Sequence, residues 1–240
     1  MSRVEYNLDG KIAVVTMNSG ENRFNPPFLE EFLRILDEIE NDTDANALVA
    51  RTAHEKIFTN GLDLDWLIPT IQEGDLETAK NFIYTLMGLL KRILIYPMPT
   101  IAAIGGHAFA GGALLCCAFD FRFMRSDRGY FCLPEVDLGM PFLPGMTAIL
   151  KKAIPIYKLE EMKYTGKRLT AEECEKHHII MKAYHKDKLM DEALAFAKGL
   201  DKKREAIATL KKGMYKDIVH VIDVEDPSEI ESSSFGSLSL

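Results

Sequence analysis

The hydrophobic and polar positions of this chain change between a period of two and a period near 3.6, which predicts alternating strands and helices. Val4–Leu8 and Lys11–Met17 alternate around Asp9-Gly10, and this arrangement predicts a β-hairpin. Pro26 then opens a segment whose apolar residues recur at helical spacing as far as Asn41. The first 42 residues therefore predict a hairpin followed by an amphipathic helix.

The same alternation continues through the middle of the chain, and helical signals dominate from Pro144 onward. Further strands are predicted at 47–52, 100–104, 120–124, 130–133 and 179–184. Further helices are predicted after Gly61, at 75–96, from Gly111, and at 145–153, 157–164, 170–177, 188–198 and 202–215. Repeated βα units favour right-handed crossovers and a sheet covered by helices, so the expected fold class is α/β.

Composition and charge narrow the range of partners. The 240 residues include 47% hydrophobic positions, and the net charge is -7. This acidic balance argues against nucleic acid or an anionic membrane surface as the main partner, because both attract clustered positive charge. The segment from Ile101 to Phe119 has no charged side chain, but two glycine pairs divide it, so it predicts a strand, a turn and a buried helix rather than a membrane span.

The four cysteines show neither the spacing of a zinc site nor that of a redox pair, and this favours a reducing, intracellular location. Cytoplasmic localisation is therefore expected. The C-terminal Leu238-Ser239-Leu240 resembles the peroxisomal Ser-Lys-Leu signal but lacks its basic middle residue and its small first residue, so a peroxisomal location is the alternative.

One acid stands in an otherwise apolar setting downstream of two glycine turns. Glu135 follows Leu133-Pro134, and the turns are centred on Gly61 and on Gly111-Gly112. Tight turns can aim backbone N–H groups at a developing negative charge, and a nearby carboxylate can move a proton, so this set predicts proton chemistry beside a carbonyl. A plain surface acid is the alternative for Glu135, and Asp137 is the alternative base.

These residues, read together, resemble the crotonase superfamily, also called the enoyl-CoA hydratase/isomerase family, and within it the Δ3,Δ2-enoyl-CoA isomerases. The resemblance is carried by the segments 58–66, 98–108 and 110–112 and by 127–129 leading to 135–139, in the family's order. It implies a crotonase-like spiral of ββα units over residues 1–185, a C-terminal helical trimerisation region over 186–222 and a flexible tail over 223–240. A homotrimer or a dimer of trimers is implied as well.

The resemblance also implies roles for individual residues. Glu135 would be the catalytic acid-base, and the N–H groups of Leu62 and Gly111 would form the oxyanion hole. Where the family's hydratases carry a first glutamate, three residues after Gly111, this chain has Leu114. Substrate-binding positions would be Phe58, Asn60, Gly61, Asp63, Leu64, Gly112 and Leu114.

A single glutamate suits migration of a double bond better than addition of water, so the expected activity is that of an isomerase acting on an unsaturated fatty acyl-CoA. No metal and no separate cofactor is implied, because CoA enters as part of the substrate. Two other hypotheses about function stay open. The protein could be a hydratase, a hydrolase or another enolate-handling relative, or it could be a non-catalytic acyl-CoA-binding scaffold.

Overall fold

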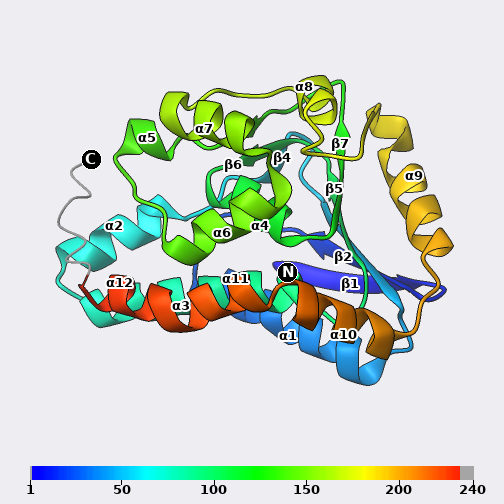
Figure 1. Cartoon of the computed structure of the whole chain (residues 1–240), viewed down its shortest axis with the longest axis horizontal. Helices are drawn as coiled ribbons and strands as arrows, with labels where there is room; N and C mark the ends of the chain where they lie inside the picture. Colours follow the sequence, from blue (N-terminus) through cyan, green and yellow to red (C-terminus); the bar gives the residue numbers. More distant parts are fainter. Residues whose placement is uncertain (1, 233–240) are drawn as a thin grey trace.

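The computed structural model describes residues 2–232, and over this range the chain forms a mixed α/β structure with two sheets (Figure 1). The Leu238-Ser239-Leu240 terminus lies outside the described residues. The strands are β1 (Val4–Asp9), β2 (Ile12–Met17), β3 (Ala47–Thr52), β4 (Ile57–Thr59), β5 (Thr100–Ile104), β6 (His107–Phe109), β7 (Phe121–Arg125), β8 (Phe131–Cys132) and β9 (Lys182–Tyr184).

The larger sheet has six strands in the order β1-β2-β3-β5-β7-β9. The predicted hairpin is confirmed, because β1 and β2 pair antiparallel with Val4 opposite Met17 and Asp9 opposite Ile12. Every later pairing in this sheet is parallel, which requires the chain to cross over between strands. Side chains of both faces are buried, as is usual for parallel strands covered by helices.

The smaller sheet alternates along the chain with the larger one, and this alternation produces the spiral of ββα units. It contains β4, β6 and β8, all parallel, and each of them follows directly after a strand of the larger sheet. The chain thus runs from β3 to β4, from β5 to β6 and from β7 to β8, and each pair is followed by helix. These are the predicted ββα units, and they bring the ends of β4, β6 and β8 to one side of the molecule.

The helices pack on both faces of the larger sheet. They are α1 (Pro26–Asp42), α2 (Leu64–Gln72), α3 (Leu76–Leu94), α4 (Gly111–Ala118), α5 (Glu135–Leu138), α6 (Pro144–Ala153), α7 (Ile156–Thr165), α8 (Ala171–Lys176), α9 (Lys186–Gly199), α10 (Arg204–Met214), α11 (Lys216–His220) and α12 (Asp226–Ser232). No helix within residues 2–232 has both the length and the apolar character needed to cross a membrane.

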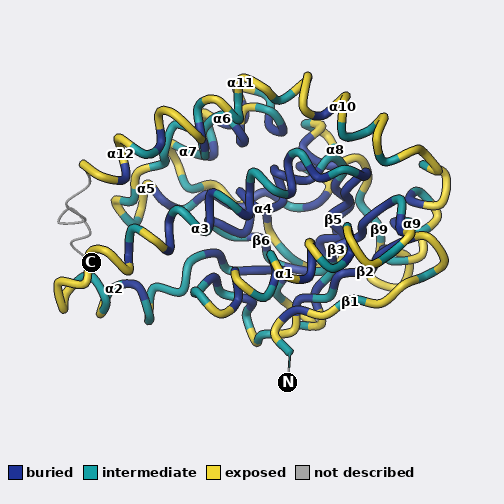
Figure 2. Tube along the Cα trace, turned by 90° about the horizontal axis from the view of Figure 1, so that it is seen from below, coloured by how far each residue is buried: buried dark blue, intermediate teal, exposed yellow. Residues whose placement is uncertain are grey.

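The main core lies between the larger sheet and helices α1, α3, α4 and α6, and Figure 2 shows these segments as buried along most of their inner sides. α1 starts where the sequence predicted, since Asn25 Oδ1 accepts a hydrogen bond from the N–H of Phe28 and prolines fill the first helical positions. A second cluster lies on the other face, under α9. The predicted boundary at residue 185 falls just before α9, which itself packs on the sheet.

The C-terminal helices return along the molecule beside α1 and α3 (Figure 1). Arg204 at the start of α10 donates hydrogen bonds to the carbonyl oxygens of Glu40 and Thr43 at the end of α1. The expectation of a loose chain from Asp223 is corrected for residues 223–232, because a π-helical turn (Val221–Glu225) and α12 cover residues 221–232. Residues 233–240 lie outside the described part of the chain. The trimer assigned to this region stays a prediction.

Candidate active site

A cavity of roughly 500 Å³ lies where the spiral, α3, α6 and α12 meet. Its lining is mostly apolar, and Glu135 is the one residue in that lining whose side chain can ionise near neutral pH. The lining residues are Asn60, Leu62, Leu64, Leu67, Ile83, Leu86, Phe109, Ala110, Gly111, Leu114, Pro134, Glu135, Leu138, Met140, Pro141, Phe142, Leu143, Met146, Ile230 and Ser232. A cavity of this size and polarity suits a small ligand with a long apolar part.

Glu135 occupies the first turn of α5, immediately after β8. It is 7% exposed, and its Oε2 atom is buried without a hydrogen-bond donor among residues 2–232. Burial raises the pKa of Glu135 to about 7, against the opposing charge of Lys163. A carboxylate with a pKa near neutral pH can both accept and return a proton under ordinary conditions.

The second acid of this segment lies elsewhere. Asp137 is the alternative base in the sequence analysis, and in the structure both acids lie on the single helical turn of α5. Side chains two residues apart in a helix point in directions about 200° apart around the helix axis, so the side chains of Glu135 and Asp137 point to different sides. Asp137 packs against Gly166, at the end of α7, and it is absent from the cavity lining.

The first glycine turn shapes one wall of the cavity. Gly61 has a φ of +75°, which is a conformation that side chains rarely adopt. Its carbonyl oxygen accepts a bond from Phe24 N at 2.7 Å, and Asp63 N donates to Phe24 O at 2.9 Å. In a parallel bridge of this kind the residue between the two bonds turns its own N–H to the other side. The N–H of Leu62 therefore points away from Phe24, and Leu62 itself lines the cavity.

The second turn supplies the start of α4. Gly111 is the first helical residue, so its N–H is one of those that have no acceptor within the helix. Ala110 before it has a φ of +52°, an uncommon conformation for alanine that sets the direction of the following peptide. The positive end of the α4 dipole therefore faces the cavity that both residues line.

The two turns touch each other directly. A Cβ atom at Gly61 would lie 2.6 Å from Gly111 N, and one at Gly112 would lie 2.3 Å from Thr59 O. Glycine is required at these positions because backbone packs on backbone. The contact fixes the N–H groups of Leu62 and Gly111 relative to each other, although they are 49 positions apart in the chain.

The predicted substrate-binding residues divide into two groups. Asn60, Leu64 and Leu114 line the cavity. The others lie behind it: Phe58 is fully buried in the core, Asp63 accepts a hydrogen bond from Asn25, and Gly61 and Gly112 form the close backbone contacts.

Sequence reasoning missed several wall residues. Phe109, Phe142 and the α12 residues Ile230 and Ser232 line the cavity without belonging to any predicted motif. The α12 residues carry no local signal, because only the return of the C-terminal helices brings them to α3.

The arrangement is suited to one type of chemistry. A carboxylic acid with a near-neutral pKa and two residues from tight turns, Leu62 and Gly111, line one apolar enclosure. Fixed donors stabilise negative charge that develops on a carbonyl oxygen, and a low-dielectric site strengthens that effect. No three His, Cys, Asp or Glu side chains gather within residues 2–232 to hold a metal ion.

Comparison with known proteins places the chain in a family. The model of the enoyl-CoA hydratase/isomerase family matches residues 7–237, and the chain belongs to that family. Enoyl-CoA delta isomerase 3 of Arabidopsis thaliana is 28% identical over 222 residues, which are 90% of this chain and 93% of that protein. A putative enoyl-CoA hydratase of Thermus thermophilus is 31% identical over 208 residues, 85% of this chain and 79% of that protein.

Solved structures confirm the crotonase-like fold. A probable enoyl-CoA hydratase from Mycobacterium tuberculosis H37Rv matches with a TM-score of 0.87 at 24% identity, covering 98% of this chain and 96% of that one. The apo structure of the Mtb enoyl-CoA isomerase matches with a TM-score of 0.86 at 23% identity, covering 97% and 99%. Because the names of relatives include both activities, the choice between isomerase and hydratase depends on the site itself.

Proposed function

We propose that this protein is a Δ3,Δ2-enoyl-CoA isomerase, in which Glu135 moves a proton between two carbons of an unsaturated acyl-CoA. The observation that carries the proposal is the single carboxylate of the cavity. Leu114 lies where the resemblance places the first glutamate of the hydratases, and it is 2% exposed and lines the cavity. Addition of water is harder when one of the two acids is replaced by an apolar side chain.

The reaction follows from the positions of these groups. Glu135 takes a proton from C2 of a 3-enoyl thioester, and the electron pair of that C–H bond moves onto the thioester oxygen through the conjugated system. The N–H groups of Leu62 and Gly111 hydrogen-bond to this oxygen. Glu135 then returns the proton to C4 while the double bond forms between C2 and C3. Removal of one such donor typically raises the barrier by roughly 2.7–4 kcal/mol.

The apolar walls accommodate the acyl chain. Leu67, Ile83, Leu86 and Ile230 present hydrocarbon to the cavity, and no charged side chain apart from Glu135 lines it. The CoA part would remain outside these walls, and the protein would need no metal or additional cofactor.

A relative from Arabidopsis thaliana is named enoyl-CoA delta isomerase 2, peroxisomal. For this chain, both the cytoplasmic location and the peroxisomal alternative stay predictions.

A hydratase is the second candidate, because a relative from Clostridium acetobutylicum, 26% identical over 240 residues, is named short-chain-enoyl-CoA hydratase. It would need a second acid to orient or protonate water, and none comes from the cavity lining. A non-catalytic acyl-CoA scaffold is the third candidate, and it would bind substrate equally well without the Glu135 carboxylate.

The test uses purified protein with a trans-3-enoyl-CoA and, separately, a trans-2-enoyl-CoA. Conjugation is followed by ultraviolet absorbance and products by mass spectrometry. We expect the 3-enoyl substrate to become the 2-enoyl product and Glu135→Gln to abolish this turnover while keeping acyl-CoA binding. Asp137→Asn is the matched control, because Asp137 lies on the same helical turn but outside the cavity lining.

Three results would contradict the proposal. Addition of water to the 2-enoyl substrate without isomerisation would favour the hydratase. Binding without turnover would favour the scaffold. Full activity in Glu135→Gln, with loss in Asp137→Asn, would move the base to Asp137.

A further inference from the structure

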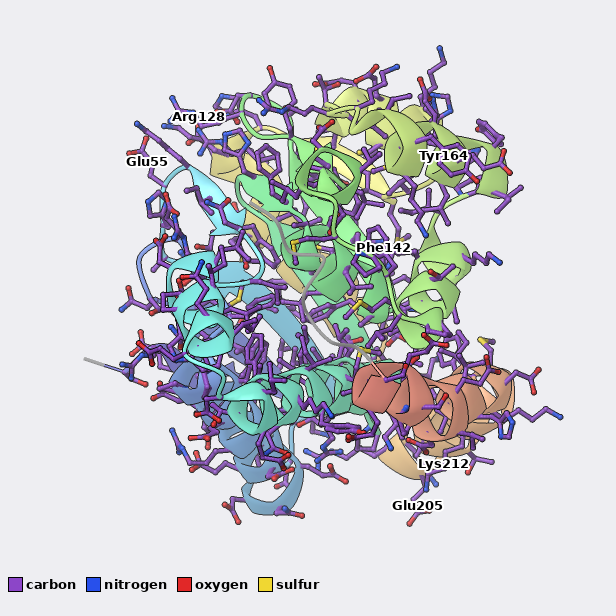
Figure 3. The ribbon with its side chains drawn as sticks, turned by 90° about the vertical axis from the view of Figure 1, so that its left-hand side faces the viewer. Glu55, Arg128, Phe142, Tyr164, Glu205 and Lys212 are labelled. Carbon is purple, nitrogen blue, oxygen red and sulfur yellow. The ribbon has the colours of Figure 1, made fainter. Side chains whose placement is uncertain are left out.

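A second, smaller cavity lies on the α9 face of the larger sheet. Its volume is roughly 180 Å³, about a third of the roughly 500 Å³ of the candidate active site, and the two cavities share no lining residue. Four of its lining residues carry basic side chains: Arg51, His54, Arg125 and Lys186. In Figure 3, Glu55, which also lines it, lies at the upper left edge of the molecule, away from Phe142 at the candidate active site.

The sheet brings the two arginines to this cavity from strands that are not neighbours. Alternate residues of β3 and of β7 belong to the core cluster under α9, and Arg51 and Arg125 continue these two series. β5 lies between the two strands, and its residues at the cavity are Ala103 and Gly105. Neighbouring strands are about 4.8 Å apart, so β3 and β7 are about 10 Å apart across a floor with little side-chain volume.

Arg51 is the arginine of this cavity that lacks an acceptor. The residue is half-buried, and its Nε atom is buried without a hydrogen-bond partner among residues 2–232. Its guanidinium group takes part in none of the ion pairs within that range. A buried N–H group without an acceptor costs free energy, and a bound anion would supply the acceptor.

Arg125 is fixed by the protein itself. Its Nε and Nη2 atoms donate hydrogen bonds to Asp127 Oδ2 at 2.9 and 2.6 Å, and its Nη1 atom donates to the carbonyl oxygen of Glu55 at 2.8 Å. A guanidinium group has five N–H groups, so three bonds leave two of them for another partner. Arg125 is therefore a positioned donor at this cavity.

The remaining two basic residues lie on the loop after β3 and at the start of α9. His54 Nδ1 accepts hydrogen bonds from the N–H groups of Lys56 and Ile57, both at 3.0 Å, so in the neutral ring Nε2 carries the proton and is a donor. Lys186 is the first residue of α9, and its backbone N–H donates to Asp127 Oδ1 at 2.9 Å. The positive end of the α9 dipole therefore lies beside the Lys186 side chain.

Two carboxylates offset part of this positive charge. Asp127 pairs with Arg125, and the exposed Glu55 lines the cavity. The three cations Arg51, Arg125 and Lys186 against these two carboxylates leave one net positive charge. The whole chain has a net charge of -7, so this cavity has the opposite sign of charge from the protein as a whole.

We propose that this cavity binds a phosphate group, either as inorganic phosphate or as the end of a small phosphate monoester. Donors reach it from β3, β7 and α9, and a tetrahedral oxyanion presents oxygen atoms to several sides, whereas the two oxygens of a carboxylate lie in one plane. Arginine side chains bind phosphate oxygens through paired N–H groups. Because no lining residue belongs to the candidate active site, the proposal is independent of the role of Glu135.

The first measurement is calorimetric titration of the full-length protein with inorganic phosphate and, separately, with glycerol 3-phosphate, at low ionic strength and with saturating acyl-CoA present. We expect saturable binding, and the ligand that binds more tightly identifies the source of the phosphate group. Arg51→Met should weaken binding by about 10- to 100-fold, because it removes charged hydrogen bonds. Arg51→Lys keeps the charge without the planar pair of donors and should recover part of the affinity.

The matched control is Arg128→Met. Arg128 is an exposed arginine that does not line the cavity, so its loss should leave the affinity unchanged. Acetate should bind at least about tenfold more weakly than phosphate, because it has fewer oxygens and a smaller charge. The proposal would be overturned by the absence of saturable binding, by equal affinity in Arg51→Met and the wild type, by equal binding of acetate, or by displacement of phosphate by acyl-CoA.

Thermal unfolding gives a second measurement that needs no enzyme assay. A ligand that binds the folded state raises Tm, so phosphate should raise the Tm of the wild type and leave that of Arg51→Met nearly unchanged. Without phosphate, Arg51→Met should be at least as stable as the wild type, because it buries no unpaired N–H group. If Arg51→Met does not fold, the exposed Lys186→Met serves in its place and should show a smaller Tm rise than the wild type. Equal rises in the wild type and the cavity variants would show a general salt effect and would refute the site.

Discussion

Replacing Glu135 by glutamine should stabilise the fold in a manner that depends on pH. The carboxyl group is 7% exposed, and its buried Oε2 has no hydrogen-bond donor among the described residues. Its ordinary pKa of 4.5 rises to about 7 in the folded protein because burial disfavours the charged form. Above about pH 7, folding therefore has to bury the charge of the Glu135 carboxylate in the cavity wall. The glutamine amide has the same shape and no charge, so it avoids this cost.

The direction of the stability change follows from the protonation of Glu135 in the folded protein and in the unfolded protein. Below pH 4.5 both the folded and the unfolded protein hold the proton, so the charge costs nothing. Between pH 4.5 and about 7 the unfolded chain releases the proton first, and stability falls as the pH rises. Above about pH 7 the cost is complete. At about 1.36 kcal/mol for each pH unit, it amounts to about 3 kcal/mol.

Urea unfolding at pH 4.5 and at pH 8, at one protein concentration, measures the difference. Glu135→Gln should have the same free energy of unfolding as the wild type at pH 4.5 and up to about 3 kcal/mol more at pH 8. Asp226, whose pKa burial raises to about 6, is present in both proteins and cancels in the comparison.

Glu30→Gln, on the exposed side of α1, controls for the loss of a surface carboxylate. Equal stability of Glu135→Gln and the wild type at pH 8 would refute the reasoning, because it would mean that the Glu135 carboxylate is solvated in the folded state.

Two other substitutions test the walls of the cavity. Gly61→Ala places a Cβ atom 2.6 Å from Gly111 N, at a φ of +75°, so it should displace one backbone donor. We expect kcat to fall by roughly 10²–10³ in single-turnover kinetics. A near-normal kcat would show that Leu62 and Gly111 do not act together. Ile230→Ala removes three carbon atoms from the α12 wall and should move the chain-length optimum of a saturated acyl-CoA binding series upward by about three carbons. Val224→Ala, on the same C-terminal segment but 58% exposed, should leave the optimum unchanged; an unchanged optimum in Ile230→Ala as well would exclude α12 from the acyl site.

The parts of the fold that sequence predicted are those with strong local signals. The hairpin turn at Asp9-Gly10 and the start of α1 after Asn25 depend on residues within a few positions of each other. Gly61 and Gly111 could be singled out for the same reason, since a tight turn needs glycine wherever it occurs. The pattern could not show that these two glycines touch, because that contact depends on the parallel pairing of β4 with β6.

The local conformation around Glu135 was harder to anticipate. The sequence Leu133-Pro134-Glu135 follows a strand, and nothing in its hydrophobic pattern distinguishes another extended residue from a single turn of helix. The turn matters because it separates Glu135 from Asp137, placing the first at the cavity and the second against Gly166. The preference for Glu135 over Asp137 came from the motif, and the helical turn adds a geometric reason for it, while the catalytic role of Glu135 stays a prediction.

The C-terminal segment shows most clearly what the sequence left out. Its acidic and serine-rich composition is typical of a loose tail, yet three charged groups hold it to the core. Asp223 pairs with Lys91 at 2.6 Å, Glu231 pairs with Lys80 at 2.7 Å, and Asp226 Oδ1 accepts a bond from the N–H of Gly145 at 2.8 Å. The acids that suggested disorder thus have partners on α3 and at the start of α6.

Attachment of α12 has a consequence for the proposed reaction. In Figure 1, α5, which carries Glu135, lies at the upper left and α12 lies at the lower left. Residues of both helices line the same cavity. An acyl chain whose thioester lies near Glu135 and Gly111 would extend toward α3 and α12. The exposed ion pairs contribute little each, about 0–1 kcal/mol, so α12 is held mainly by its buried residues Asp226 and Ile230. Chain-length selection would then depend on a helix anchored by a few buried side chains, and proton transfer on a site whose turns are packed backbone against backbone.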